Sequence, residues 1–574
     1  MAEMTEFTQK PWLPSYAGGV PAEISEPTQT LVQMMTASVK KYRRRPALDF
    51  FGATMSYGEL GDQIARVASG LKKLGVTHGD RVALVMPNSP QHVVAFYAVL
   101  RLGAIVVEHN PLYTERELRH QFEDHGATVA IVWDKVAASV VGFPKDMKIR
   151  HVISVDVTRA MPLHVRTALR LPLPAARASR KALTTGSAVK GAIVWNELVE
   201  SRRLARSHRG PSLTDTAVLQ YTSGTTGAPK GAILTHANLR ANAMQGEAWV
   251  PGLRAGREVF YGVLPMFHAY GLTLCLTFAM SMGARLVLFP KFDPELVLKV
   301  IKKRPATFLP AVPPIYEKLT AAAKEAGISL QGIEIAISGA MPLSASVVEP
   351  WEAETGGTLV EGYGLSETSP VLMANPVGPT RRAGTVGLPL PNTEVRVVDP
   401  ENPTVDREAG AEGELIVRGP QVFSGYWKKP DETAAVFVPS SDDGADWYRT
   451  GDIVTIDDDG FVRIVDRIKE MIIVGGFKIA PSEVEDMLRS HPDIADIAVV
   501  GIPDADGSEH VVAAVVLAPG KKLDQESIRD FARANLTPYK VPRRVVAVDE
   551  LPKSLIGKIL RRKVRDQLIA DQSK

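Results

Sequence analysis

Apolar and polar residues along the first part of the chain follow the periods of both helices and strands. Between residues 57 and 74, apolar side chains recur every three or four positions, which predicts an amphipathic helix: Leu60, Ile64, Val67, Leu71 and Leu74. Ser56 and Glu59 form a capping box before it, and Gly75 is placed to end it. Continuous apolar runs predict strands at 81–86, 104–109 and 127–134, with a helix at 92–103. This alternation predicts doubly wound α/β layers around parallel sheets.

The pattern changes twice toward the C-terminus. From 384 to 466 the sequence becomes short strands and turns, which predicts a β-rich subdomain. A polar linker follows, and residues 467–574 predict a small α+β domain with helices near 482–489 and 526–536. At 574 residues the chain is too long for one core. We therefore expect a large N-terminal domain, 1–466, and a small mobile C-terminal domain, 467–574.

Composition excludes several classes of protein. A net charge of +3 is small for this length and argues against a nucleic-acid partner. The single cysteine, Cys275, excludes an intrachain disulfide and lies in an apolar run typical of a core. The first twelve residues have no signal-peptide pattern, and no apolar run reaches 18 residues. We expect a cytoplasmic protein.

Residues 157–190 interrupt the α/β pattern. They contain seven Lys or Arg and no Asp or Glu, and Pro162, Pro172 and Pro174 prevent one long helix. A solvated loop is one interpretation of this basic insertion. Peripheral contact with an anionic lipid surface is the other.

The stretch YTSGTTGAPKGA, at 221–232, has the chemistry of a polyphosphate-binding loop. Glycines let a backbone approach a ligand, hydroxyls donate to phosphate oxygens, and lysine adds a charge. The predicted nucleotide ligands here are Thr222, Ser223, Gly224, Thr225, Thr226, Gly227 and Lys230. The spacing is not that of Walker A, which disfavours a P-loop phosphotransferase.

Four more motifs follow in order: EGYGLSET at 361–368, YRTGD at 448–452, DRIKEMIIVGG at 466–476 and LPKSLIGKILRR at 551–562. With the first loop they resemble the adenylate-forming family of acyl-CoA synthetases, luciferases and peptide-synthetase adenylation domains. The resemblance covers nearly the whole chain. The leader at 11–24 and the GYGLSET motif are most similar to bacterial long-chain fatty-acid–CoA ligases.

The resemblance implies a two-step reaction. A fatty-acid carboxylate attacks ATP to give acyl-AMP and pyrophosphate, and coenzyme A then displaces AMP. Tyr363 would stack on adenine, Thr368 would contact the α-phosphate, Glu367 would hold Mg²⁺, and Asp452 would accept from the ribose hydroxyls. Arg467 would lie beside ribose and phosphate. The nucleotide pocket would also include Glu361 and small residues that leave room for an acyl chain: Gly339, Ala340, Gly362 and Gly364.

The remaining roles are also implied by the resemblance. His268 would line the carboxylate pocket by shape, and Lys558 would stabilise the charge that develops in adenylation. Lys469 would be the hinge about which the C-terminal domain rotates. That rotation would bring the CoA-binding residues Gly475, Gly476 and Phe477 to the site.

Several alternatives stay open. An aryl-acid–CoA ligase has the same motifs with a shorter pocket, and a fatty acyl-AMP ligase would donate to a carrier protein. A catalytically dead scaffold is disfavoured because Lys230, Glu367, Asp452 and Lys558 are all present. Chain-length preference and oligomeric state, a homodimer included, are undetermined.

Overall fold

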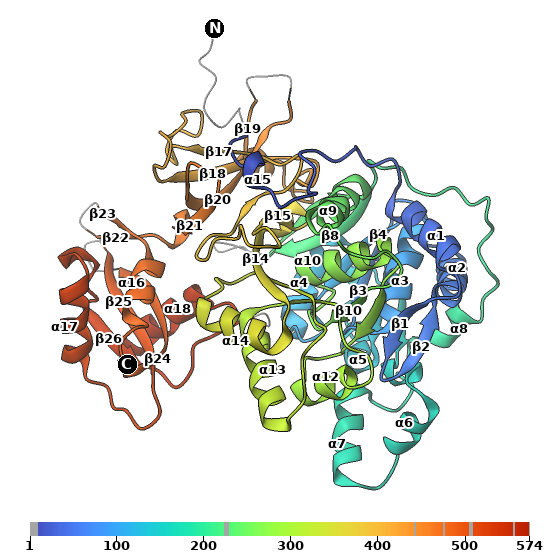
Figure 1. Ribbon diagram of the computed structural model, residues 1–574. Coiled ribbons are helices and arrows are strands. Elements are labelled where there is room, and N and C mark those ends of the chain that lie inside the picture. Colours follow the sequence, from blue (N-terminus) through green and yellow to red (C-terminus); the bar gives the residue numbers. More distant parts are fainter. Residues whose placement is uncertain are drawn as a thin grey trace.

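The computed structural model describes residues 10–222, 229–440, 444–474, 477–503, 509–554 and 557–572. In that part of the chain, two large sheets form the body (Figure 1). The seven-stranded sheet has the order β7-β6-β5-β3-β4-β8-β9. Its strands are β3 (Arg81–Val85), β4 (Ile105–His109), β5 (Val129–Trp133), β6 (His151–Val155), β7 (Ile193–Val194), β8 (Thr216–Thr222) and β9 (Lys230–Thr235).

The second large sheet has nine strands in the order β16-β15-β14-β13-β12-β10-β11-β1-β2. They are β1 (Pro46–Phe50), β2 (Ala53–Ser56), β10 (Val259–Gly262), β11 (Arg285–Leu288), β12 (Phe308–Ala311), β13 (Ile335–Ser338), β14 (Thr358–Gly364), β15 (Val371–Ala374) and β16 (Leu388–Pro389). The central strands of both sheets are parallel, as the alternating pattern predicts, and antiparallel pairs occur toward the edges.

Helices cover the sheets and fill the space between them. The capping box at Ser56 and the positive φ of Gly75 confirm both predicted ends of α2 (Tyr57–Lys73). Helix α3 (Pro90–Arg101) contacts β3 and β4 of one sheet and β1 of the other, and is buried from Pro90 to Leu100. The other helices of the body are α1 (Leu31–Lys41), α4 (Glu115–His125), α5 (Asp134–Val141), α8 (Trp195–Val199), α9 (His236–Trp249), α10 (Ala269–Gly271), α11 (Ala279–Ser281), α12 (Pro294–Ile301), α13 (Pro313–Ala326) and α14 (Ala345–Thr355).

A buried π-helix, Leu272–Phe278, follows α10. Cys275 lies in it with no exposed surface, and burial raises the pKa of its thiol to about 12. The predicted core role of this cysteine is confirmed.

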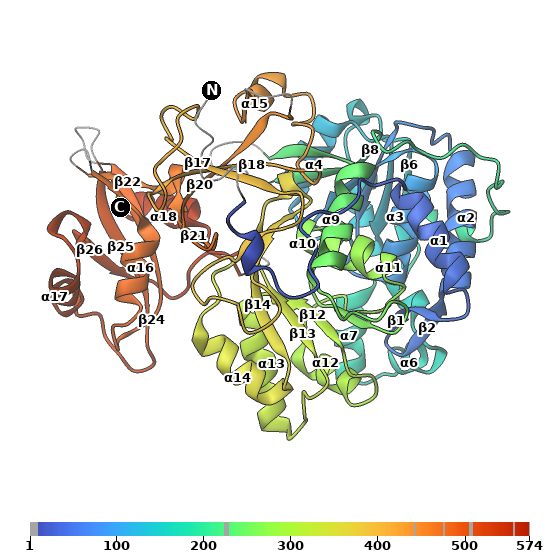
Figure 2. The same ribbon diagram turned by 45° about the horizontal axis from the view of Figure 1, so that its top comes forward.

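The β-rich region and the C-terminal region follow the body in sequence and in space. A five-stranded sheet contains β17 (Glu394–Val398), β18 (Gly413–Arg418), β19 (Phe437–Val438), β20 (Trp447–Ile456) and β21 (Val462–Arg467), with α15 (Pro430–Ala434) beside it. Both views place this sheet between the body and the C-terminal region (Figures 1 and 2). The C-terminal region contains β22 (Ile472–Val474), β23 (Phe477–Ile479), α16 (Pro481–Leu488), β24 (Ile494–Pro503), β25 (Glu509–Leu517), α17 (Gln525–Asn535), β26 (Arg544–Ala547) and α18 (Arg561–Gln572).

The basic insertion forms two short helices, α6 (Leu163–Ala168) and α7 (Pro174–Leu183), in agreement with the predicted effect of its prolines. They project from the body in Figure 1. Among the described residues, no helix has both the length and the apolar character needed to cross a bilayer.

A second strand, not predicted from the sequence, follows the stretch at 221–232. The chain returns from it as strand β9, antiparallel to β8, with Thr222 paired with Lys230. The stretch therefore joins two strands of a hairpin, and helix α9 begins only after β9. Residues 223–228 lie outside the described part of the chain.

Candidate active site

Three predicted nucleotide residues meet where β14 approaches the β-rich sheet. Asp452 on β20 is paired in register with Arg467 on β21, and the Arg467 Nε–Asp452 Oδ1 distance is 2.9 Å. The Tyr363 hydroxyl, from β14, donates to Oδ2 of the same aspartate. Asp452 is 2% exposed, and its charge holds the pKa of Arg467 above the usual range. The three side chains form one rigid polar wall.

A second group links Glu367 to Lys230. Glu367 lies in a short 3₁₀ turn, Ser366–Thr368, and its Oε1 accepts a 2.8 Å hydrogen bond from the Tyr426 hydroxyl. Lys230 Nζ lies 5.1 Å from the centroid of the Tyr426 ring and 2.5 Å from Glu432 Oε2. Tyr426 therefore connects the predicted magnesium ligand to the end of the phosphate-type hairpin.

Lys558 reaches this site from the C-terminal region. An antiparallel bridge between Lys553 and Ile559 closes its hairpin, and the backbone N–H of Lys558 donates to Ser554 Oγ over 3.1 Å. Gly557 turns with φ +80° against Met341 of the body, where a Cβ would come within 3.2 Å of the sulfur. The hairpin is therefore seated on the body.

The charge environment of Lys558 shows which groups it faces. Burial, with the charge of Arg467, lowers its pKa to about 8, and the charges of Glu470 and Asp452 oppose the shift. Burial, with the charge of Lys558, lowers the pKa of His268 to about 4. His268 is therefore neutral near pH 7, and its Nδ1 accepts from the backbone N–H of Tyr270 over 3.3 Å. A neutral, oriented ring fits the pocket-lining role that the resemblance implies.

An ion-pair network positions this hairpin relative to the β-rich sheet. Arg561, three residues after Lys558, pairs with Glu470 and, at 2.7 Å, with Glu485 of α16. Asp466 Oδ2, on β21, accepts from the backbone N–H of Ser482 in α16 over 2.9 Å. The predicted hinge residue, Lys469, lies exposed between these contacts in a short turn, Ile468–Glu470.

Thr368 is not placed as the resemblance implies. It is 0% exposed, and its hydroxyl donates to the Pro370 carbonyl and accepts from the Leu365 N–H over 3.1 Å. A hydroxyl used in this way closes its own loop and is not presented to a phosphate. Ser366, two residues earlier in the same turn, is partly exposed.

The small residues also have a different task from the one expected. A Cβ on Gly364 would lie 1.8 Å from the carbonyl oxygen of Pro370, and one on Gly339 would lie 3.1 Å from the Tyr270 ring. Their missing side chains admit neighbouring protein atoms, so they do not leave open space for an acyl chain. Gly362 is in ordinary contact distance of its neighbours, and Ala340 is exposed with φ +66°.

The remaining predicted residues are placed as follows. Glu361, on β14, is an acceptor for the backbone N–H of Leu343 at 3.2 Å, and burial raises its pKa to about 8. Phe477 is exposed on β23 and stacks on Tyr539, with centroids 4.5 Å apart. Seven predicted residues lie outside the described part of the chain: Ser223, Gly224, Thr225, Thr226, Gly227, Gly475 and Gly476.

Tyr426 and Arg561 were not among the residues predicted from the sequence. Tyr426 is 59 residues from the glutamate that it contacts, so no local motif marks it. Arg561 lies within the last motif, and the signal that would have found it is its place three residues after Lys558.

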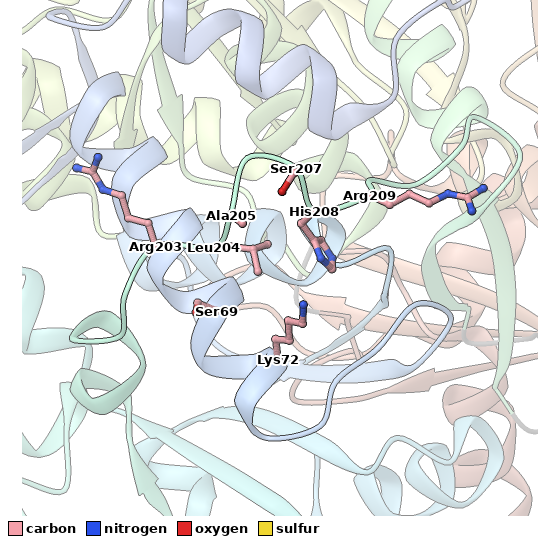
Figure 3. A pocket seen from close by; sticks show the side chains of 8 residues that line it. All are labelled: Ser69, Lys72, Arg203, Leu204, Ala205, Ser207, His208 and Arg209. Atoms are coloured by element: carbon pink, nitrogen blue, oxygen red, sulfur yellow. The ribbon is translucent and has the colours of Figure 1, made fainter.

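Two hollows lie elsewhere. One, of about 490 Å³, is lined by Ser69, Lys72, Arg203, Leu204, Ala205, Ser207, His208 and Arg209 (Figure 3). The other, of about 380 Å³, lies among β2, α2, α8 and the start of the basic insertion. None of the predicted nucleotide residues lines either hollow.

Residues 457–460, which include three aspartates, form the hairpin turn between β20 and β21. Gly460 N–H donates to the Asp457 carbonyl over 2.9 Å, and Arg382 pairs with Asp457 at 2.5 Å. In the described part of the chain, no group of three or more His, Cys, Asp or Glu is arranged to hold a metal.

Two family models match the chain. The AMP-binding enzyme family matches residues 35–427, and the AMP-binding enzyme C-terminal domain matches residues 483–558. The chain belongs to the AMP-binding enzyme family. Its relatives include the long-chain-fatty-acid–CoA ligase of Bacillus subtilis, 39% identical over 98% of each chain. The enzyme of the same name from Escherichia coli O157:H7 is 38% identical over 97% of this chain and 98% of its own.

Solved structures of AMP-binding enzymes have the same fold. ATP-bound MatB from Rhodopseudomonas palustris has a TM-score of 0.79 and 28% identity, covering 94% of this chain and 99% of its own. A fatty acyl CoA synthetase of Mycobacterium tuberculosis has a TM-score of 0.72 and 26% identity, covering 94% and 99%. The match extends over body, β-rich sheet and C-terminal region alike.

Proposed function

We propose that this protein is a fatty-acid–CoA ligase that activates medium- to long-chain acids through acyl-AMP. The observation that carries the proposal is the meeting of Lys558 with His268, Asp452 and Arg467 in one site. Relatives named long-chain-fatty-acid–CoA ligase match nearly the full length of the chain and support the substrate class.

In the first step, Asp452 would accept from the ribose hydroxyls, because a carboxylate offers two acceptor oxygens. Arg467 pairs with that carboxylate, and Tyr363 fixes its orientation. Lys558 would lie between the acid's carboxylate and the α-phosphate, where a cation stabilises developing charge. Neutral His268 would orient the carboxylate without exchanging a proton.

In this proposal, two hydroxyls and one cation contact the phosphates of ATP. Thr222 and Lys230, at the ends of the hairpin, would contact the leaving pyrophosphate. Ser366 takes the α-phosphate contact that the resemblance implies for Thr368, since its side chain is partly exposed.

The residues present fit magnesium. Glu367 is a single buried carboxylate, and Mg²⁺ typically binds one or two carboxylates together with substrate phosphate oxygens. Bound there with ATP, Mg²⁺ would neutralise phosphate charge.

For the second step, we propose that residues 1–466 and 467–574 are the two domains and that Lys469 is their hinge. Rotation would withdraw Lys558 and bring Phe477 and its neighbours to coenzyme A. The exposed position of Lys469 and the exposed ring of Phe477 support this assignment. Because ATP and coenzyme A are its co-substrates, we place the enzyme in the cytoplasm, with peripheral membrane contact through 157–190.

The function is tested by following both half-reactions with purified protein. We expect pyrophosphate release that depends on added acid, and AMP release that then depends on coenzyme A. Acids from C4 to C18 and benzoate are compared. Turnover of benzoate alone would replace the fatty-acid substrate by an aryl acid, and acyl-AMP formation without AMP release would indicate a carrier-protein partner.

A further inference from the structure

Helices α6 and α7 and their connection, residues 163–183, project from the body in Figure 1, and neither helix has a buried residue. Three leucines within eleven residues are exposed on the surface of this segment: Leu163 is 74% exposed, Leu171 47% and Leu173 56%. Large aliphatic side chains this exposed, and this close together in sequence, differ from the scattered single ones normal for a protein surface.

Basic residues lie between these leucines and after them. They are Arg166, Arg170, Arg177, Arg180 and Lys181, and all but Arg166 are classed as exposed. No acidic residue occurs between 157 and 190. In the ranges that the structure describes, no ion pair joins these five cations to a carboxylate. The surface therefore has an unbalanced positive charge.

The surface is attached firmly at its C-terminal end. Trp133 Nε1 donates to the Leu183 carbonyl over 2.8 Å, and the Thr185 N–H donates to Asp134 Oδ2 over 2.9 Å. At the other end, Val157 and Met161 are buried in the main core. Helices held at both ends present their exposed residues as a fixed surface of the enzyme.

We propose that residues 163–183 dock the enzyme on an anionic lipid bilayer. The leucines would enter the boundary between headgroups and acyl chains, while the cations stay at the headgroup phosphates, as in interfacial helices. A nucleic acid would use the cations but gives the three leucines no apolar partner, so the pattern favours lipid. The proposed function explains only why the enzyme would dock on lipid, since long-chain acids dissolve in a bilayer. The docking itself does not depend on that function.

The charge contribution is tested by a triple reversal, R177E/R180E/K181E. Vesicles of phosphatidylglycerol and phosphatidylcholine are sedimented with wild-type or variant protein at 0.1 M salt. At about 1 kcal/mol for each basic residue near the surface, we expect binding to fall about 100-fold. The matched control is R202E/R206E/R209E, which changes the net charge equally in the exposed segment between α8 and β8. We expect less than threefold change from the control.

The apolar contribution is tested separately with L163S/L171S/L173S, against the exposed pair L112S/L523S as control. We expect at least tenfold weaker binding, with the dependence on salt unchanged because the cations remain. Adenylation of octanoate serves as the check that each variant is folded. Because octanoate is soluble in water, this activity does not depend on binding to vesicles.

Three results would overturn the docking surface. The first is equal binding of the wild type to phosphatidylglycerol vesicles and to pure phosphatidylcholine, and the second is equal loss of binding in both charge-reversal variants. The third is binding to RNA that matches vesicle binding and does not change in the leucine variant. Loss of octanoate adenylation in the wild type would instead contradict the proposed function, so the two failures are distinguishable.

Discussion

Asp452 and Lys558 face the same site but are held in opposite ways. Asp452 lies in the middle of β20, a strand paired on both sides with β18 and β21. Lys558 lies on a hairpin whose seat on the body is a glycine turn against Met341. A strand residue cannot leave without breaking its sheet, whereas the hairpin can withdraw as a unit. The proposed nucleotide wall is therefore fixed by its sheet, and we expect the proposed catalytic cation to be removable with its hairpin.

The contacts at the hinge hold the removable part in its present place. The Arg561–Asp466 pair, at 3.9 Å, and the Asp466–Ser482 hydrogen bond join the C-terminal region to the end of β21. When the region moves, polar contacts of this kind can be exchanged for hydrogen bonds to water. Such an interface suits an enzyme that uses two orientations.

Replacing Lys558 by Ala should have the largest effect and separates the two regions most sharply. We expect acyl-AMP formation to fall 10²- to 10³-fold, since one charge-stabilising group in an active site contributes about that much. Conversion of supplied acyl-AMP to acyl-CoA should change less than threefold. Lys553→Ala removes a lysine of the same hairpin, paired with Asp496 at 2.6 Å, and is the control. Equal loss in both half-reactions would contradict a cation used in one step.

Asp452→Asn should affect both steps, because the wall does not move. The amide keeps one acceptor oxygen but loses the charge paired with Arg467, so kcat/KM for ATP should fall about 30-fold. We expect a similar loss of affinity for acyl-AMP, measured by isothermal titration. Asp457→Asn, in the turn of the same β20–β21 hairpin, is the control. A loss confined to the ATP step would place Asp452 outside the permanent part of the site.

Arg561→Gln should weaken the placement of Lys558 without touching the site. We expect adenylation to fall about tenfold and the thioester step to be unchanged or faster, because fewer contacts hold the first orientation. The control is Arg565→Gln on the same helix, which breaks a 3.2 Å pair with Glu509 of β25. Equal effects of the two changes on adenylation would show that helix stability, not orientation, is responsible.

The sequence predicted the layered fold and most of this site, since local patterns carry both. The period of apolar residues located the strands and helices of the body, and the motifs located Tyr363, Asp452 and Lys558. It could not distinguish the hydroxyls of Ser366 and Thr368, because the choice depends on which one the Pro370 carbonyl accepts from. For the same reason, the sequence could not show which atoms fill the space beside Gly339 and Gly364. Strand β9 was missed because its evidence is pairing with β8.

The smallest effect should be a pH dependence of kcat/KM for ATP that arises from Lys558. The lowered pKa of Lys558, about 8, means that the lysine is protonated below that pH and loses its charge above it. Since kcat/KM reports the free enzyme, we expect kcat/KM for ATP to be halved at pH 8 and to fall further at higher pH. Lys558→Arg, whose guanidinium stays protonated, should remove this decline, while His268→Phe should keep it, because His268 is already neutral. If kcat/KM for ATP still declined at alkaline pH in Lys558→Arg, the titrating group would not be Lys558. The pH dependence would then arise outside the hairpin.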